Sequence, residues 1–180
     1  KYVQANSAGI FDKIKEDLKA GIFVLFSGTP CQVSGLINFL RRDYDNLLTI
    51  DLMCHGVPSP GLFKKCVSFI EDKYRGKVVD YRFRDKSVLG WSSGSSSIVL
   101  EKNGKHKVLR YDNALRAYFL AFIKGLSLRA SCYSCHFSSF DRAGDITLGD
   151  FWYAEKLYNE DSFKKGVNLL LVNSLKGEKI

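Results

Sequence analysis

The stretch Ile22-Phe23-Val24-Leu25-Phe26-Ser27-Gly28-Thr29-Pro30-Cys31-Gln32 predicts a buried strand that leads at once into a helix. Residues 22–26 are all apolar, as expected of a strand that is buried on both faces of a sheet. Thr29 is a favourable N-cap, Pro30 suits the first helical position, and Gln32 completes a capping box. We therefore expect a strand over 22–26 and a helix that begins at Pro30.

A second strand follows this helix and completes a βαβ motif. Apolar residues at helical spacing continue to Leu40, and residues 47–53 form a strand-like run that ends at Cys54. The crossover in such a motif is right-handed, so the two strands are expected to be parallel. Ligand sites in parallel sheets lie beyond the carboxyl ends of the strands. Cys31 and Cys54 are therefore expected at one edge of the sheet.

The remaining sequence alternates between helix and strand patterns. Asn103-Gly104 is a strong hairpin signal, and the segment around Trp91 is rich in Gly and Ser, which indicates a surface loop. The other expected elements are helices over 11–18, 60–70 and 114–123 and strands over 78–83, 97–100, 107–111, 145–152 and 167–172. The expected fold class is α/β, with a mixed, partly parallel sheet, flanking helices and an inserted β-hairpin.

Size and cysteine content limit the class of protein. A chain of 180 residues is expected to form a single domain over 1–180 and to bury about two-thirds of its surface without disulfides. Five cysteines, an odd number, indicate a reducing compartment, so we expect a cytoplasmic protein. No apolar run reaches about 18 residues, so no membrane span is expected. Because a helical pattern precedes the first strand, we expect that an N-terminal segment is missing from this sequence.

The net charge of +8 indicates an anionic partner. The basic residues are scattered, with pairs at Arg41-Arg42 and Lys64-Lys65 but no long run. An anionic cofactor or an acidic redox partner fits this distribution as well as nucleic acid does. We expect no nucleic acid.

Four of the five cysteines lie in loops or at helix starts, where thiolates from distant segments can meet at one metal centre. Cys31 is near a helix N-terminus, which favours the thiolate. Cys54 ends a strand, and Cys132 and Cys135 form a C-x-x-C pair. Cys66 lies in an expected helix and is predicted to serve packing only. A C-x-x-C has several uses, so a 4Fe-4S cluster and a zinc site both remain open.

Histidines next to the cysteine motifs bear on this choice. A zinc site could be completed by Cys31 and Cys54 or by a histidine such as His55 or His136. His55 could also donate a hydrogen bond to a cluster, donate a proton or serve as a turn residue. A thioredoxin-type disulfide site is disfavoured, because the C-x-x-C follows a helix instead of a strand.

Taken in order, the motifs resemble those of the C-terminal domain of the coenzyme F420 hydrogenase/dehydrogenase beta-subunit family. The resemblance implies that the N-terminal domain usual in this family is missing from this sequence. The resemblance runs over essentially the whole chain. The motifs that carry it are Gly28-Thr29-Pro30-Cys31-Gln32, Met53-Cys54-His55-Gly56, Phe83-Arg84-Asp85-Lys86 with Gly90-Trp91, Cys132-Tyr133-Ser134-Cys135-His136-Phe137, and Arg142-Ala143-Gly144-Asp145-Ile146-Thr147-Leu148-Gly149-Asp150-Phe151-Trp152.

This resemblance implies an iron–sulfur flavoprotein oxidoreductase. Members pass electrons between a 4Fe-4S cluster, FAD and a deazaflavin (coenzyme F420) or another acceptor. The family motifs imply that Cys31, Cys54, Cys132 and Cys135 are the metal ligands. The expected partners are a redox protein such as ferredoxin, or a hydrogenase or dehydrogenase subunit. The alternative is a non-catalytic, zinc-binding structural or interaction domain.

Cofactor contacts beyond the cysteines are predicted at Thr29, Arg84 and Lys86. Arg84 and Lys86 follow the strand at 78–83 and are expected at the same kind of sheet edge as Cys31 and Cys54. A guanidinium pairs well with the phosphates of a flavin nucleotide. Trp91 could stack on a ring or pack its own loop. No glycine-rich dinucleotide fingerprint is present, so FAD binding is implied by the resemblance alone. No catalytic residue is singled out by the sequence.

Overall fold

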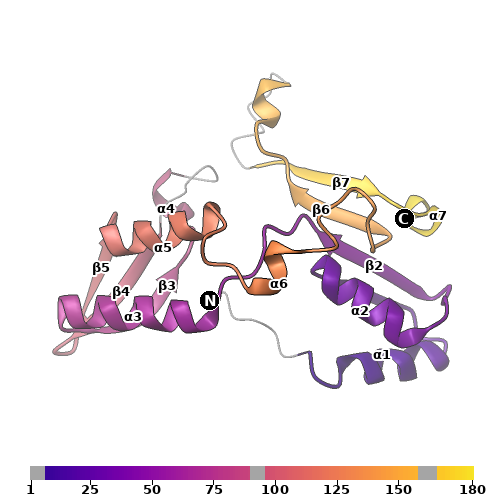
Figure 1. Cartoon of the computed structure of the whole chain (residues 1–180), viewed down its shortest axis with the longest axis horizontal. Coiled ribbons are helices and arrows are strands. Elements are labelled where there is room, and N and C mark those ends of the chain that lie inside the picture. Colours follow the sequence, from indigo (N-terminus) through magenta and orange to yellow (C-terminus); the bar gives the residue numbers. More distant parts are fainter. Residues whose placement is uncertain (1–6, 90–95, 158–165) are drawn as a thin grey trace. The chain divides into compact units, whose positions relative to one another are not determined.

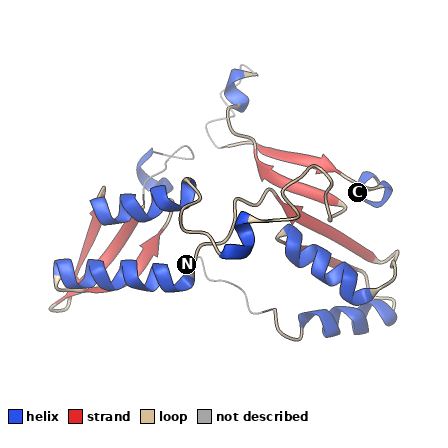
Figure 2. Ribbon diagram, viewed as in Figure 1, coloured by secondary structure: helices blue, strands red, loops and turns tan. Residues whose placement is uncertain are grey.

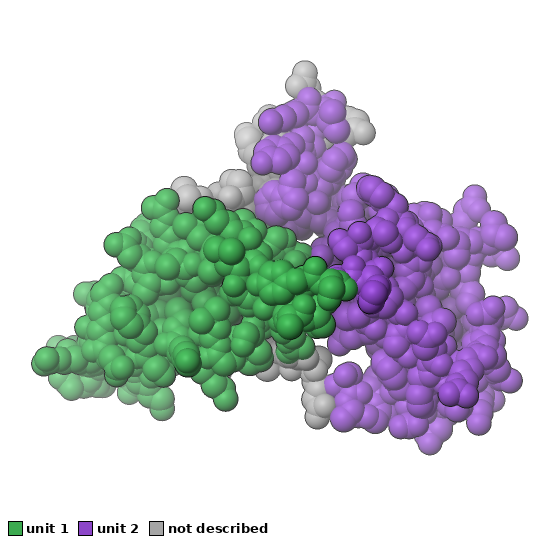
Figure 3. Space-filling model, in the orientation of Figure 1, with its two compact units in different colours: residues 1–4, 55–134 green, residues 5–54, 135–180 purple. Residues whose placement is uncertain are grey.

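The computed structural model describes residues 7–89, 96–157 and 166–180. The chain forms two compact units (Figure 3). Unit 1 consists of Lys1–Gln4 and His55–Ser134, and unit 2 of Ala5–Cys54 and Cys135–Ile180. Unit 2 is thus built from two separated stretches of sequence. That the chain acts as a single domain stays a prediction.

Unit 2 holds the mixed sheet that the sequence predicts. Its strands β1 (Val24–Gly28), β2 (Leu47–Leu52), β6 (Ile146–Asp150) and β7 (Asn168–Val172) lie in the order β1-β2-β6-β7. β1 and β2 are parallel, as are β2 and β6, whereas β7 runs antiparallel to β6. The α/β class and the partly parallel sheet are therefore confirmed.

Helices α1 (Ile10–Lys19) and α2 (Pro30–Leu40) pack against β1 and β2 in unit 2 (Figure 1). The short helix α7 (Leu175–Glu178) follows β7, and a 3-10 turn, η1 (Ala154–Lys156), follows β6. The buried core between the helices and the sheet contains Ile14, Leu18, Leu36, Leu40, Tyr44 and Leu47. As predicted, α2 begins at Pro30 with Thr29 as its N-cap and Gln32 in a capping box.

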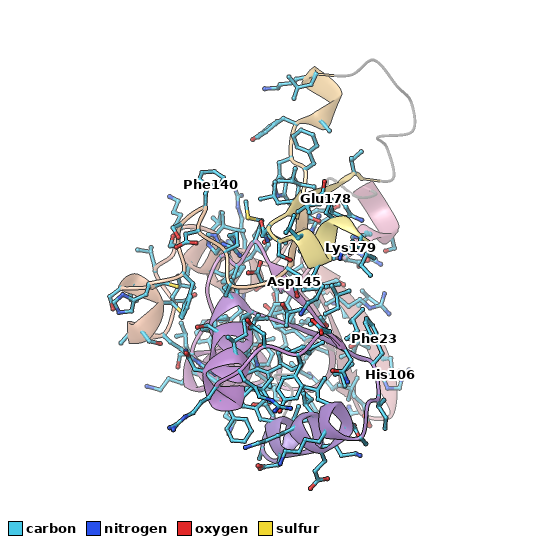
Figure 4. The ribbon with its side chains drawn as sticks, turned by 90° about the vertical axis from the view of Figure 1, so that its right-hand side faces the viewer. Phe23, His106, Phe140, Asp145, Glu178 and Lys179 are labelled. Carbon is cyan, nitrogen blue, oxygen red and sulfur yellow. The ribbon has the colours of Figure 1, made fainter. Side chains whose placement is uncertain are left out.

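The expectation that the first strand is buried on both faces was wrong. The strand covers residues 24–28, and its Val24 and Phe26 pack on the core under α1 and α2. Successive side chains alternate between faces, and Leu25 on the other face is 55% exposed. Phe23, just before the strand and labelled in Figure 4, is 58% exposed. The continuous apolar run at residues 22–26 therefore predicted more burial of the first strand than the structure shows.

Unit 1 contains a separate antiparallel sheet. Its strands β3 (Lys77–Arg82), β4 (Ser97–Lys102) and β5 (Lys105–Arg110) lie in the order β3-β4-β5. Helices α3 (Pro60–Tyr74) and α5 (Asn113–Ile123) run alongside these strands (Figure 2). The unit also holds two single-turn helices, α4 (Lys86–Leu89) and α6 (Ala130–Tyr133).

The predicted hairpin is confirmed as β4 and β5. Its turn residues Asn103 and Gly104 have φ of 51° and 71°, the left-handed pair that favours Asn-Gly. β3 pairs with β4, so the inserted hairpin belongs to a second, antiparallel sheet. The predicted loop around Trp91 lies outside the described residues.

A bilayer-spanning helix needs about 20 mostly apolar residues. None of the helices in the described part of the chain combines that length with that apolarity.

Asp112 ties α3 to the start of α5. As N-cap of α5 it accepts a hydrogen bond from the Ala114 N–H at 2.8 Å, and its other oxygen accepts from Lys73 Nζ at 2.8 Å and from the Tyr74 hydroxyl. Burial of Asp112 opposes its ionisation, but the hydrogen bonds from Lys73, Tyr74 and Ala114 outweigh that effect and lower its pKa to about 2.

Tyr81 lies in the aromatic core of unit 1 with its hydroxyl buried and without a hydrogen-bond partner among the described residues. Its ring contacts Phe63, Phe83 and Tyr118. Burial, with a smaller contribution from Cys66, raises the pKa of Tyr81. An unsatisfied buried hydroxyl costs free energy that a phenyl ring does not.

We predict that Tyr81→Phe leaves the free energy of unfolding unchanged or raises it by up to about 1 kcal/mol. Tyr74→Phe is the matched control, because it removes a hydroxyl that donates to Asp112 and is expected to cost about 1 kcal/mol. Urea unfolding followed by circular dichroism measures both changes. A larger loss of unfolding free energy in Tyr81→Phe than in Tyr74→Phe would contradict the assignment of the Tyr81 hydroxyl as buried without a hydrogen-bond partner among the described residues.

Candidate cysteine site at the edge of the mixed sheet

Cys31 and Cys54 lie at the same edge of the unit 2 sheet, as predicted. β1 and β2 are in parallel register from Val24 opposite Leu47 to Gly28 opposite Asp51, so their carboxyl ends are adjacent. Cys31 is the second residue of α2, which begins just after β1, and Cys54 follows shortly after the end of β2. Both cysteines are exposed, and neither forms a disulfide.

The N-cap of α2 places a hydroxyl beside Cys31. Thr29 Oγ1 lies 3.1 Å from Cys31 Sγ and 3.0 Å from Gln32 Oε1. Gln32 Oε1 also accepts the Thr29 backbone N–H at 2.9 Å. Because the Thr29 hydroxyl donates to Gln32 Oε1, its oxygen can accept a hydrogen bond from the Cys31 thiol. The structure thus gives Thr29 a role in capping and at Cys31, and its predicted contact with a flavin stays a prediction.

The boundary between the two units falls inside the C-x-x-C. Cys132 is in α6 and belongs to unit 1, whereas Cys135 is in the irregular segment that opens the second part of unit 2. Cys132 is partly buried and Cys135 exposed, and both are free thiols. Cys66, by contrast, packs against the core of unit 1, and burial raises the pKa of its thiol, as does the nearby Asp112.

Among the described residues, no three His, Cys, Asp or Glu side chains are grouped so that they could hold a metal ion. The four-cysteine ligand set therefore stays a prediction. Its chemistry fits the expected group, because loop and helix-start thiols of this kind are the ligands of iron–sulfur clusters.

A buried ion pair at the same edge was missed by sequence reasoning. Arg142 Nη2 donates to Asp51 Oδ1 at 2.8 Å, with 5% of the Arg142 side chain and none of the Asp51 side chain exposed. Thr147 Oγ1 and the Gly144 N–H also donate to Asp51, at 2.6 and 3.1 Å. Asp51 is the only charged residue in β2, which is otherwise mostly apolar. A charged residue in such a strand is rarely buried without a partner, so Asp51 was the sequence signal for this ion pair.

Asp145 is a second acidic anchor in unit 2 and is partly buried. Its Oδ2 accepts from the N–H and Oγ1 of Thr49, at 2.8 and 2.7 Å, and its Oδ1 accepts from Ser174 Oγ at 2.6 Å. Burial opposes ionisation of Asp145, but the hydrogen bonds from Ser174 and Thr49 lower its pKa. Asp145, which is labelled in Figure 4, therefore joins β2 to Ser174, the N-cap of α7.

The predicted flavin contacts Arg84 and Lys86 flank a structural carboxylate in unit 1. The buried Asp85 accepts hydrogen bonds from Ser87 Oγ at 2.5 Å, Ser97 Oγ at 2.6 Å and Arg110 Nε at 3.3 Å. The hydrogen bonds from Ser87, and then that from Ser97, hold the pKa of Asp85 well below its usual range. Asp85 thereby holds the turn that carries both cations.

The expectation that Arg84 follows the same kind of parallel sheet edge was wrong. β3, which precedes it, belongs to the antiparallel sheet of unit 1. An antiparallel neighbour needs only a loop, whereas a parallel one needs a crossover. Whether Arg84 and Lys86 bind a cofactor stays a prediction.

His55, which follows Cys54, is hydrogen-bonded to α5 in unit 1. Its Nε2 donates to the Phe122 carbonyl oxygen at 2.8 Å, since a carbonyl can only accept. Its ring also meets the ring of Phe122 edge-on at 4.9 Å between centroids. His136 is exposed. Any role of either histidine at a metal stays a prediction.

The fold and this edge define an α/β domain with cysteines at the carboxyl ends of parallel strands. The chain belongs to the family described as the C terminus of the coenzyme F420 hydrogenase/dehydrogenase beta subunit, whose model matches residues 23–180. The resemblance predicted from the motifs is therefore confirmed. Membership gives the chain an oxidoreductase context, as one domain of an enzyme subunit. No curated protein matches the chain.

Proposed function

We propose that this chain is an iron–sulfur flavoprotein oxidoreductase domain in which Cys31, Cys54, Cys132 and Cys135 hold a 4Fe-4S cluster. Such a cluster would carry one electron at a time. FAD would accept electrons singly from the cluster and pass them in pairs to a deazaflavin or another acceptor, or run in the reverse direction. The residues of the chain provide the thiolates, their orientation and the hydrogen bonds around them. Family membership supports the redox class.

One observation carries the proposal. Two exposed cysteines from separate segments follow adjacent parallel strands and lie at one edge of the sheet. Ligand sites of open α/β sheets lie at this edge. Cys31 lies in the first turn of α2, and the oxygen of the Thr29 hydroxyl is 3.1 Å from its sulfur. A packing role requires neither exposure nor these neighbours.

For the flavin, we propose that Arg84 and Lys86 bind its phosphates. Support comes from the turn that carries them, because Asp85 fixes the backbone between the two cations. A rigid turn lowers the entropic cost of binding an anion.

An acidic electron carrier such as ferredoxin, or a hydrogenase or dehydrogenase subunit, is the proposed partner. The net charge of +8 supports such a partner. None of the five cysteines, all of which the structure describes, forms a disulfide, which fits the reducing cytoplasm.

Anaerobic purification of the full-length protein tests the proposal. We expect brown protein with broad visible absorption, about four iron and four sulfide per chain, and bound flavin. Colourless protein with stoichiometric zinc would instead establish the zinc-binding domain as the function. Full-length protein that binds no flavin and reduces no acceptor would overturn the oxidoreductase assignment. Aerobic samples are excluded from the comparison, because oxygen destroys exposed clusters.

A further inference from the structure

Arg142 uses all three guanidinium nitrogens inside unit 2. Nη2 donates to Asp51 Oδ1 and to the Leu52 carbonyl oxygen, both at 2.8 Å. Nε donates to Asp51 Oδ1 at 3.3 Å and to Thr147 Oγ1 at 3.2 Å. Nη1 donates to the carbonyl oxygens of Phe137 and Ser139, both at 3.3 Å. Only 5% of the side chain is exposed.

These contacts join the two segments that carry Cys54 and Cys135. Leu52 is the last residue of β2 and lies two positions before Cys54. Phe137 and Ser139 lie two and four positions after Cys135. One guanidinium therefore holds the backbone that follows Cys135 against the end of the strand that leads to Cys54.

The Cys135 segment has little else to hold it. Residues 134–145 contain no helix or strand. Within this segment, Phe140 is 88% exposed and so contributes no apolar anchor (Figure 4). The Ser138 N–H reaches the Cys135 carbonyl only at 3.4 Å. The carbonyl oxygens of Leu52, Phe137 and Ser139 accept hydrogen bonds from Arg142. The planar guanidinium directs its N–H donors in fixed directions, which a lysine ammonium cannot reproduce.

We propose that Arg142 is a positioning residue, held in orientation by Asp51, that places the Cys135 segment beside the end of β2 and so pre-arranges two of the four proposed cluster ligands. This inference rests on the proposed function, because it concerns the same thiols. Arg142 already donates with all three guanidinium nitrogens, to Asp51, Thr147 and backbone carbonyl oxygens. It acts through the backbone of the segments that carry the ligands, and partners of this outer kind typically change metal affinity by about 10–100-fold when they are lost.

The test compares Arg142→Lys with Lys176→Met in the full-length protein. Lys176 is the matched control because its Nζ also binds backbone carbonyls in unit 2, those of Tyr44 and Leu47 at 2.8 and 2.9 Å. These lie at the start of β2, the opposite end from Cys54. Both substitutions weaken the unit, but only Arg142→Lys frees the Cys135 segment.

Two readouts are needed, and neither is enzyme activity. Hydrogen–deuterium exchange of the metal-free protein reports the order of residues 135–141. After anaerobic reconstitution, the rate of iron loss to a chelator reports how firmly the cluster is held. We expect Arg142→Lys to speed exchange over 135–141 and to speed iron loss about tenfold or more. Lys176→Met is expected to lower the thermal midpoint while both readouts over the cysteine edge stay at wild-type values.

Equal rates of iron loss in the two variants would overturn the inference and leave the proposed function intact, since the wild-type protein would still carry its cluster. Unchanged exchange over 135–141 in Arg142→Lys would overturn it as well. A wild-type protein that takes up no iron would remove the proposed function, and this inference with it. If Arg142→Lys does not fold, Arg142→Gln, which keeps one donor for Asp51, is measured in its place with the same expected results.

Discussion

Replacing Cys31 by serine is expected to remove most of the iron from anaerobically purified protein. Cys31 lies at the second position of α2, exposed, with Thr29 Oγ1 3.1 Å from its sulfur. A serine hydroxyl does not ionise at neutral pH, so one of four ligands is lost. Because cluster binding is coupled to folding, as metal binding is, the variant should also unfold at lower temperature. Iron and sulfide analysis and the visible spectrum measure the effect.

Cys66→Ser is the control for that experiment. Cys66 packs against the buried core of unit 1 and is not part of the proposed ligand set. We expect iron content to stay at the wild-type level and the free energy of unfolding to fall by about 1 kcal/mol. Equal iron loss in Cys31→Ser and Cys66→Ser would contradict the division between ligand and packing cysteines.

Asp51→Ala is expected to cost about 3–5 kcal/mol of unfolding free energy in the metal-free protein. Asp51 is fully buried and accepts hydrogen bonds from Arg142, Thr147 and Gly144. Its removal leaves the guanidinium charge of Arg142 buried without a counter-ion, which is the main part of the cost. A loss of this size is a large fraction of the roughly 5–15 kcal/mol that typically stabilises a domain. Urea unfolding followed by far-ultraviolet circular dichroism measures it.

The comparison for Asp51→Ala is Asp80→Ala. Asp80 pairs with Arg82 Nε at 3.1 Å, but the pair is on the surface, with 34% of the Asp80 side chain and 54% of the Arg82 side chain exposed. Exposed pairs contribute about 0–1 kcal/mol. If both aspartate variants lose stability by similar amounts, Arg142 is not held as a buried, paired cation.

Much of the fold was predictable because its signals are local. The apolar run before Gly28, the N-cap at Thr29 and the hairpin turn at Asn103-Gly104 each depend on residues a few positions apart. Such patterns reflect backbone preferences and periodicity, and they correctly predicted the βαβ motif, the hairpin and the main helices. The parallel edge shared by Cys31 and Cys54 followed from the handedness of the crossover.

Predictions failed where the position of a strand depended on contacts with elements that are distant in the sequence. The pattern of residues 78–83 indicates a strand, but no local feature says whether β3 joins the parallel sheet or the hairpin. The apolar run of β1 likewise shows nothing of which face the helices cover, so the exposure of Leu25 was missed. Burial of a strand is decided by its neighbours in space.

By itself, the sequence determined the strand-and-helix elements, the order of the cysteine motifs and the family to which the chain belongs. Tertiary structure alone decided the separation into two units and the pairing of Arg142 with Asp51, which are 91 positions apart. A local pattern reflects the torsional and hydrogen-bonding preferences of neighbouring residues. A buried charge instead needs whatever partner the completed fold brings within reach, because low-polarity surroundings make an unpaired ion too costly to keep.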